Sequence, residues 1–171
     1  MNMMCFIKKV IILLFIFVLA HGWVSAENTK GYLSVNGPCD FEFPEDHASH
    51  QGYRTEWWYY TGNLQSKAGN RYGFQLTFFR RRIIPSEFEK RWPTPASAWR
   101  TSQIYLAHAA ISDLEGQQHI YDQCMGRGVL GIAGEFLNNG VVHIFLKKWS
   151  ARISPKTHTL KVISDRFSFD L

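Results

Sequence analysis

The alternation of side chains in residues 72–80, YGFQLTFFR, is the feature that most constrains the fold. Every second side chain there is large and apolar: Tyr72, Phe74, Leu76 and Phe78. A period of two residues is typical of a β-strand with one buried face, whereas a helix would space its apolar residues three to four apart. The segment therefore predicts a half-buried strand.

Further segments of this kind follow along the chain. Strands are predicted at residues 57–64, 103–112, 118–125, 141–150, 159–164 and 167–171, separated by turns such as 66–70, 113–116 and 138–140. The Pro-rich insert 84–97 is either a long connection or a short helical cap, and the Gly-rich stretch 126–134 is predicted to be a flexible connection. Short strands joined by hairpin turns indicate an all-β fold, an antiparallel barrel or a sandwich.

The N-terminal residues have the order of a secretory signal peptide. Lys8 and Lys9 precede an apolar run at 10–20, and the small-residue motif Val24-Ser25-Ala26 follows. The run is shorter than the roughly 18 residues of a membrane anchor. We expect cleavage near Ala26 and an exported protein, periplasmic or extracellular. The expected organisation is a signal peptide at 1–26, a flexible leader at 27–40 and one domain at 41–171.

Charge and cysteine content narrow the classes of partner. The formal net charge of +5 includes the two signal-peptide lysines, so the excess is mild and no nucleic-acid partner is expected. The basic run at 80–82 is predicted to be a solvated strand end. Export would leave Cys39 and Cys124 in an oxidising compartment, where they are a candidate disulfide. The sequence leaves that pairing open.

The polar stretch at residues 43–62, FPEDHASHQGYRTEWWYYTG, has the most chemistry. Asp46, His47 and His50 are metal-ligand types at close spacing, but the pattern is not H-E-x-x-H and the segment is not expected to be helical. No metal is therefore predicted. Because Arg54 and Glu56 stand two apart, they point the same way on an extended chain, with Trp57 on the opposite side.

Two interpretations of Glu56 remain. In the favoured one, it forms a structural Arg–Glu pair that closes one end of a barrel beneath a tryptophan lid. In the other, burial raises its pKa and it serves as an acid or base. His108, within the apolar stretch LAHAAI, is expected to be a core residue, and Asp113 is expected to serve a turn. No nucleophile motif of the G-x-S-x-G type is present.

Three blocks in order, FPEDHASHQGYRTEWWYYTGNL, RYGFQLTFFR and YLAHAAISD, resemble the amino-terminal half of the AttH/CrtC family over about residues 41–171. The family comprises lipocalin-like proteins described as predicted secreted hydrolases, including carotenoid 1,2-hydratases and an AttH component encoded beside ABC transporters. The resemblance implies a lipocalin-like β-barrel. It also implies a truncated chain, because family members carry a second such domain to which the hydratase chemistry is attributed.

The leading expectation is an exported domain that binds an apolar or amphipathic molecule, such as an isoprenoid or lipid, without a cofactor. The alternatives are part of a hydratase-like (lyase) or hydrolase enzyme, and a non-catalytic partner of an ABC transporter. A separately encoded second domain and a membrane surface are further candidate partners. Candidate catalytic residues are Glu56 and Asp46; the family motif positions suggest as ligand-binding residues His47, His50, Arg54, Trp57, Trp58, Gln75, Arg80 and His108.

Overall fold

The computed structural model describes residues 30–171. The predicted signal peptide and its cleavage site lie outside the described residues. Within residues 30–171 no helix is both long and apolar enough to cross a membrane.

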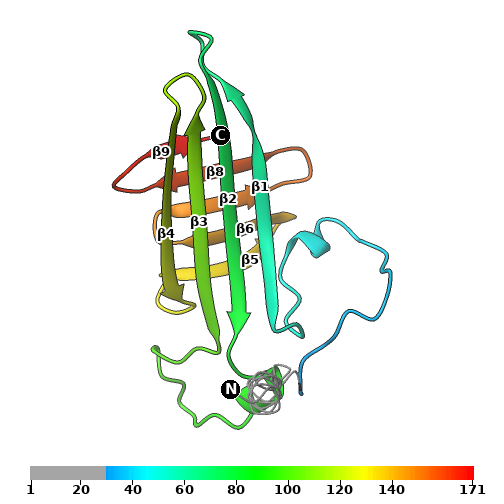
Figure 1. Cartoon of the computed structure of the whole chain (residues 1–171). Coiled ribbons are helices and arrows are strands. Elements are labelled where there is room, and N and C mark those ends of the chain that lie inside the picture. The colour runs from blue at the N-terminus through cyan, green and yellow to red at the C-terminus, as the bar shows by residue number, and fades with distance from the viewer. Residues whose placement is uncertain (1–29) are drawn as a thin grey trace, which may run out of the picture.

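The first sheet is a four-stranded antiparallel meander (Figure 1). Its strands are β1 (Thr55–Gln65), β2 (Arg71–Arg82), β3 (Gln103–Asp113) and β4 (Gln118–Arg127), paired in chain order. All four were expected from the sequence, with bounds that differ by a few residues. The turn between β3 and β4 is closed by the Gly116 N–H, which donates to Asp113 Oδ1 at 2.8 Å. The predicted turn role of Asp113 is therefore confirmed.

The second sheet has five shorter antiparallel strands, also in chain order. They are β5 (Ala133–Asn138), β6 (Val141–Leu146), β7 (Trp149–Ile153), β8 (His158–Ile163) and β9 (Ser168–Asp170). The prediction of one strand over residues 141–150 was wrong. Leu146 pairs with Trp149, and Lys147 between them has a φ of +56°. A tight hairpin turn therefore divides the segment into two strands.

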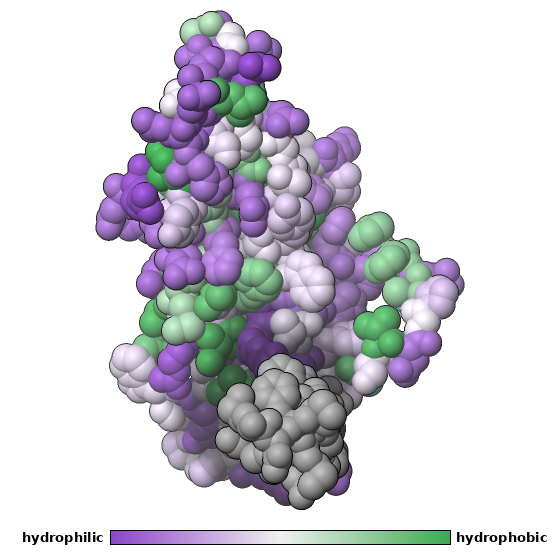
Figure 2. All heavy atoms as spheres, viewed as in Figure 1, coloured by the Kyte–Doolittle hydropathy of each residue, from purple (hydrophilic) through white to green (hydrophobic). Residues whose placement is uncertain are grey.

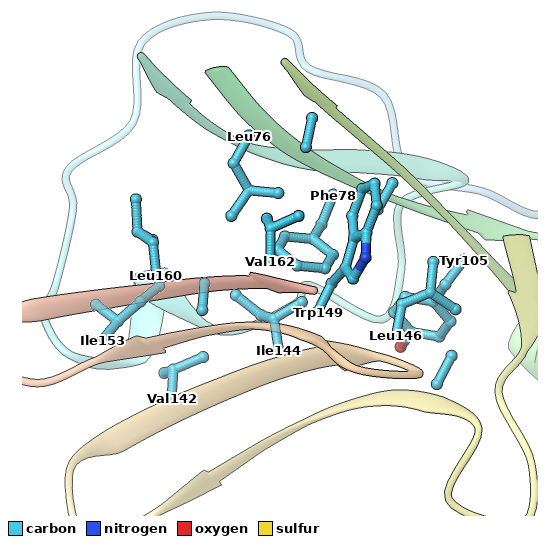
Figure 3. Packing of buried hydrophobic residues seen from close by; sticks show 14 residues of the cluster. Leu76, Phe78, Tyr105, Val142, Ile144, Leu146, Trp149, Ile153, Leu160 and Val162 are labelled. Carbon is cyan, nitrogen blue, oxygen red and sulfur yellow. The ribbon is translucent and has the colours of Figure 1, made fainter. Parts of the chain in front are cut away.

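The hydrophobic core lies between the two sheets, whose strands cross one another (Figure 1). Leu76 and Phe78 of β2 are 0% exposed and point toward the buried side chains of Val162 on β8 and Ile144 on β6 (Figure 3). The alternation in β2 thus has the predicted effect, because one face of the strand is removed from water. Trp149 closes the core and donates its indole N–H to the Ile163 carbonyl at 2.9 Å.

The all-β antiparallel class is confirmed, but a closed lipocalin-like barrel is not seen. Within residues 30–171 the ladders form two separate sheets, and none joins β4 to β5 or β9 to β1. The β4–β5 connection contains Leu130 and Gly131, with φ of +53° and +69°. This left-handed backbone interrupts the extended chain between the sheets. It belongs to the stretch 126–134 predicted to be a flexible connection, whose first two residues instead end β4 and whose last two begin β5.

Two short helices flank the first sheet. The insert after β2 contains α2 (Ser86–Glu89), which agrees with the short helical cap considered for it. The segment before β1 contains the 3-10 helix η1 (Glu45–His47). Residues 30–40 form neither helix nor strand. The segment that contains η1 lies beside β1, the edge strand of the first sheet (Figure 1).

Candidate functional site

On the face of β2 that points toward the second sheet, the buried apolar side chains Leu76 and Phe78 are followed by two arginines, Arg80 and Arg82. We call these four side chains the inner row of β2. Arg80 is 0% exposed and Arg82 is 3% exposed. The expectation of a solvated strand end is therefore wrong for both residues. Burial of a guanidinium requires partners, and both have them, although Arg80 Nη1 and Arg82 Nε find none among residues 30–171. Arg82 pairs with Glu89 of α2 and donates to Gln51 Oε1 at 2.6 Å.

Arg80 binds both a carboxylate and the backbone before β1. Its Nε donates to Glu56 Oε2 at 3.0 Å, and its Nη2 also pairs with Glu56. The same Nη2 donates to the carbonyl oxygens of His50 and Tyr53, each at 3.0 Å. Arg80 thereby fixes the chain that leads into β1. The predicted structural Arg–Glu pair exists, but its arginine is the cross-strand neighbour Arg80.

Arg54 does not take the place expected for it. Its guanidinium lies over the ring of Tyr32, 5.3 Å from the centroid. It borders a separate depression beside α2, together with Ile83 and Phe88. The cross-strand register explains the exchange, because Glu56 of β1 is directly opposite Arg80 of β2.

His50 is held between two carboxylates. Its Nδ1 lies 2.8 Å from Glu56 Oε1, and its Nε2 lies 2.8 Å from Asp46 Oδ1. The hydrogen bond to Asp46, followed by that to Glu56, raises the pKa of His50 above its ordinary value of 6.5. The same bond to His50 is the main cause of a lowered pKa at Asp46. The arrangement stabilises an imidazolium between two carboxylates.

Glu56 receives hydrogen bonds from the Arg80 guanidinium, the His50 ring and the His50 backbone N–H, the last at 2.9 Å. A carboxylate has only acceptors, so this set of donors matches its ionised form. The arrangement suits a Glu56 that anchors its neighbours. To act as a proton donor, Glu56 would have to carry a hydrogen on one of its oxygens, and both oxygens already accept hydrogen bonds from His50 and Arg80. Within residues 30–171 no group of three or more His, Cys, Asp or Glu side chains is placed to hold a metal ion.

A cleft of about 670 Å³ lies between the edge strand β1 and the segment before it. Its apolar and aromatic lining comes from Val35, Phe41, Ala48, Tyr53, Trp57 and Trp58. Its polar lining comes from Cys39, Asp40, Asp46, His47, His50, Thr55 and Glu56. The Trp58 indole N–H donates to the His47 carbonyl at 2.8 Å, so η1 is joined to the strand.

The predicted alternation in β1 is confirmed at the cleft. Trp57 is 64% exposed on the outer side, while Trp58 points inward with Glu56 and packs against the core. Six of the predicted site residues line the cleft: Asp46, His47, His50, Glu56, Trp57 and Trp58. Arg80 lies next to them through Glu56.

Gln75 and His108 lie elsewhere, on the outer face of the first sheet. They border a different shallow groove, with Tyr121 and Gln123. The expectation that His108 is a core residue was wrong: it is partly exposed and contacts Phe79 with ring centroids 5.5 Å apart. Its neighbours Ala107 and Ala109 are the buried ones, because they face the second sheet.

The candidate disulfide is not formed, since Cys39 and Cys124 are both free. Cys39 borders the cleft beside β1, while Cys124 is on β4 at the opposite edge of the sheet. The sequence interpretation also missed Val35, Asp40, Phe41 and Tyr53 as cleft residues. Phe41 and Phe43, apolar residues in an otherwise acidic segment, were the available signal.

The fold and the site together define a two-sheet antiparallel β protein with an aromatic cleft at the edge strand of its first sheet. The AttH-like family model matches residues 34–171, and the chain belongs to that family. A crystal structure at 2.00 Å of a proposed AttH from Nitrosomonas europaea is similar, with 26% identity and a TM-score of 0.58. The match covers 80% of this chain but 38% of that protein. No curated protein matches the chain.

Proposed function

We propose that this protein binds an apolar or amphipathic small molecule in the cleft beside β1. The observation that supports the proposal is the lining of the cleft: aromatic surface from Phe41, Trp57 and Trp58, with a few convergent polar groups. Small-molecule sites commonly combine a mostly apolar wall with a small number of placed polar side chains. The cleft volume of about 670 Å³ lies within the usual range for such sites.

The geometry supports binding better than catalysis. A hydratase or hydrolase would need a group that is free to give or take a proton at the substrate. Glu56, the first candidate, has both carboxylate oxygens bonded to Arg80 and His50, and Asp46 is bonded to the other side of that histidine. We therefore assign both carboxylates to holding the cleft together. The order of charged, apolar and small residues within 1–26 supports a location outside the cytoplasm.

A neutral fluorescent probe tests the proposal. The protein beginning at residue 27 is titrated with N-phenyl-1-naphthylamine and, separately, with retinol, and probe fluorescence is recorded. We expect saturable binding at one site per chain, weakened about 10-fold or more by Trp57→Ala because the variant removes a large aromatic wall. Loss of saturable binding by the unmodified protein would contradict the proposal.

The matched control is Trp99→Ala. Trp99 is 63% exposed and Trp57 is 64% exposed, so the two substitutions remove similar amounts of exposed aromatic surface. Trp99 lies in the insert between β2 and β3 and does not border the cleft. Equal weakening by both substitutions would show that the probe binds to exposed aromatic surface in general.

A further inference from the structure

The segment in front of the cleft has a charge opposite to that of the chain. Residues 33–53 contain four acidic residues and neither Lys nor Arg, whereas the whole chain has a formal net charge of +5. The four are Asp40, Glu42, Glu45 and Asp46. Arginine and lysine are likewise missing from the residues that line the cleft. The cleft mouth is therefore locally acidic on a basic protein.

Inside the cleft two of the carboxylates are already paired. Glu56 is neutralised by Arg80, and Asp46 faces the His50 imidazole. Asp40 also borders the cleft, but among the described residues its side chain has no hydrogen bond or ion pair. Glu42 and Glu45 follow it closely along the chain, and their side chains also have no ion-pair partner within residues 30–171. The uncompensated negative charge therefore lies on Asp40, which borders the cleft, and on Glu42 and Glu45, which follow it in the chain. We call these three residues the acidic rim of the cleft.

Aromatic faces and apolar side chains accompany this charge. Phe41, Tyr53, Trp57 and Trp58 border the same cleft. Leu33, Val35, Phe41 and Phe43 before β1 are 62–78% exposed. Hydrophobic and hydrophilic spheres adjoin on the projecting segment in Figure 2. An aromatic face attracts a cation through its quadrupole, and ammonium groups are bound in proteins by such faces.

We propose that the cleft selects amphiphiles with a positively charged ammonium head over those with a neutral or anionic head. The head lies at the rim near Asp40 and Phe41, and the apolar chain lies against Val35, Trp57 and Trp58. This inference rests on the proposed function, since it names the class of ligand for the same cleft. Attraction to the acidic rim and to the aromatic faces favours the cation, and the same carboxylates repel an anion.

Three amphiphiles with the same twelve-carbon chain test the selection. Dodecyltrimethylammonium is cationic, dodecyldimethylamine oxide is neutral and nearly isosteric at pH 7.5, and dodecyl sulfate is anionic. The displacement of bound N-phenyl-1-naphthylamine by each amphiphile is measured below the critical micelle concentration of that amphiphile. We expect the cation to bind roughly 3- to 10-fold tighter than the amine oxide, the size of a partly exposed cation–π and charge interaction. Dodecyl sulfate is expected to bind most weakly.

Salt and charge variants identify the cause of the preference. Raising the salt concentration from about 0.02 to 0.5 M should reduce the preference, because rim charges are screened. The double variant Asp40→Asn/Glu42→Gln should bring the ratio of cation to amine-oxide affinity close to one. The control Asp165→Asn/Glu87→Gln makes the same change in net charge at two exposed residues away from the cleft. It should leave that ratio unchanged.

The outcomes separate this inference from the proposed function. If the naphthylamine probe binds but the three heads displace it equally well, the charge preference is overturned and the binding function stands. The same holds if the control variant lowers the ratio as much as the rim variant does. If neither the probe nor any amphiphile binds at a single site, the proposed function itself fails. Circular dichroism of each variant establishes that it is folded.

Discussion

The two halves of the inner row of β2 are equally buried but chemically opposite. Leu76 and Phe78 are 0% exposed, and so is Arg80, followed by Arg82 at 3%. The first pair is stabilised by removal of apolar surface from water. The second pair depends on polar partners: Arg80 meets Glu56 and two backbone carbonyls, and Arg82 meets Glu89 and the Gln51 side chain. The side chains therefore remain buried along the strand, but the interactions that stabilise their burial change from apolar packing to ion pairs and hydrogen bonds.

This difference separates the core from the cleft. Phe78 packs between the two sheets, where it contributes to the whole domain. Arg80 instead joins Glu56 to the His50 and Tyr53 carbonyls, so it positions the segment that forms one wall of the cleft. Substitutions in the two halves should consequently have different effects: loss of packing should lower global stability, and loss of pairing should also release the cleft wall.

The largest effect is expected in the apolar half. Phe78→Ala should lower the free energy of unfolding by about 3–5 kcal/mol, because it removes a buried ring and leaves a cavity. Urea denaturation followed by circular dichroism measures the change. The control is Phe79→Ala, since Phe79 lies on the outer face and is partly exposed. Equal losses for the two variants would mean that β2 has no preferred buried face.

The next effect is expected in the charged half. Arg80→Met should lower the free energy of unfolding by about 3 kcal/mol, since it leaves the Glu56 carboxylate without its main partner. The double variant Arg80→Met/Glu56→Met should recover part of that loss, because both charges are then gone. Arg81→Met, on the partly exposed side of β2, should cost about 1 kcal/mol or less. A double variant less stable than the sum of the single ones would contradict the pairing.

The smallest effect concerns pH. The pKa of His50 is raised, so its contribution to stability is fully present below pH 6.5 and is lost as pH rises through the raised value. The pKa of Asp46 is lowered, so its contribution is present above pH 3.8 and is lost as pH falls through the lowered value. Urea midpoints of the unmodified protein and His50→Gln should therefore differ between pH 4 and 6 and converge at alkaline pH. A gap that widens with rising pH would contradict this sign.

The sequence predicts strands wherever alternation and turn residues agree. In the first sheet, β2 was found from its alternation, and its neighbours from aromatic or apolar content next to turn residues. The division between β6 and β7 was missed, because Lys147 adopts a positive φ without a glycine or asparagine to indicate it. His108 was wrongly expected in the core, because the residues on both sides of it are small or apolar and do not show which face of the strand is buried.

The site was predictable in its residue types and not in its pairings. The stretch from Asp46 to Trp58 was identified, and six of the site residues predicted within it do border the cleft. The partner of Glu56 depended on the register between β1 and β2, which the hydrophobic pattern alone does not fix to a particular arginine. The burial of Arg80 was missed because a run of basic residues is usually solvated.

The bond from the Trp58 indole to the His47 carbonyl has a thermodynamic consequence. It holds the short helix before β1 against the strand. The part of the cleft wall formed by this helix is therefore fixed by the protein's own contacts, so a ligand need not order it and less conformational entropy is lost on binding. The heat-capacity change on binding should accordingly reflect burial of ligand and cleft surface alone, without the larger signature of a segment that folds around its ligand.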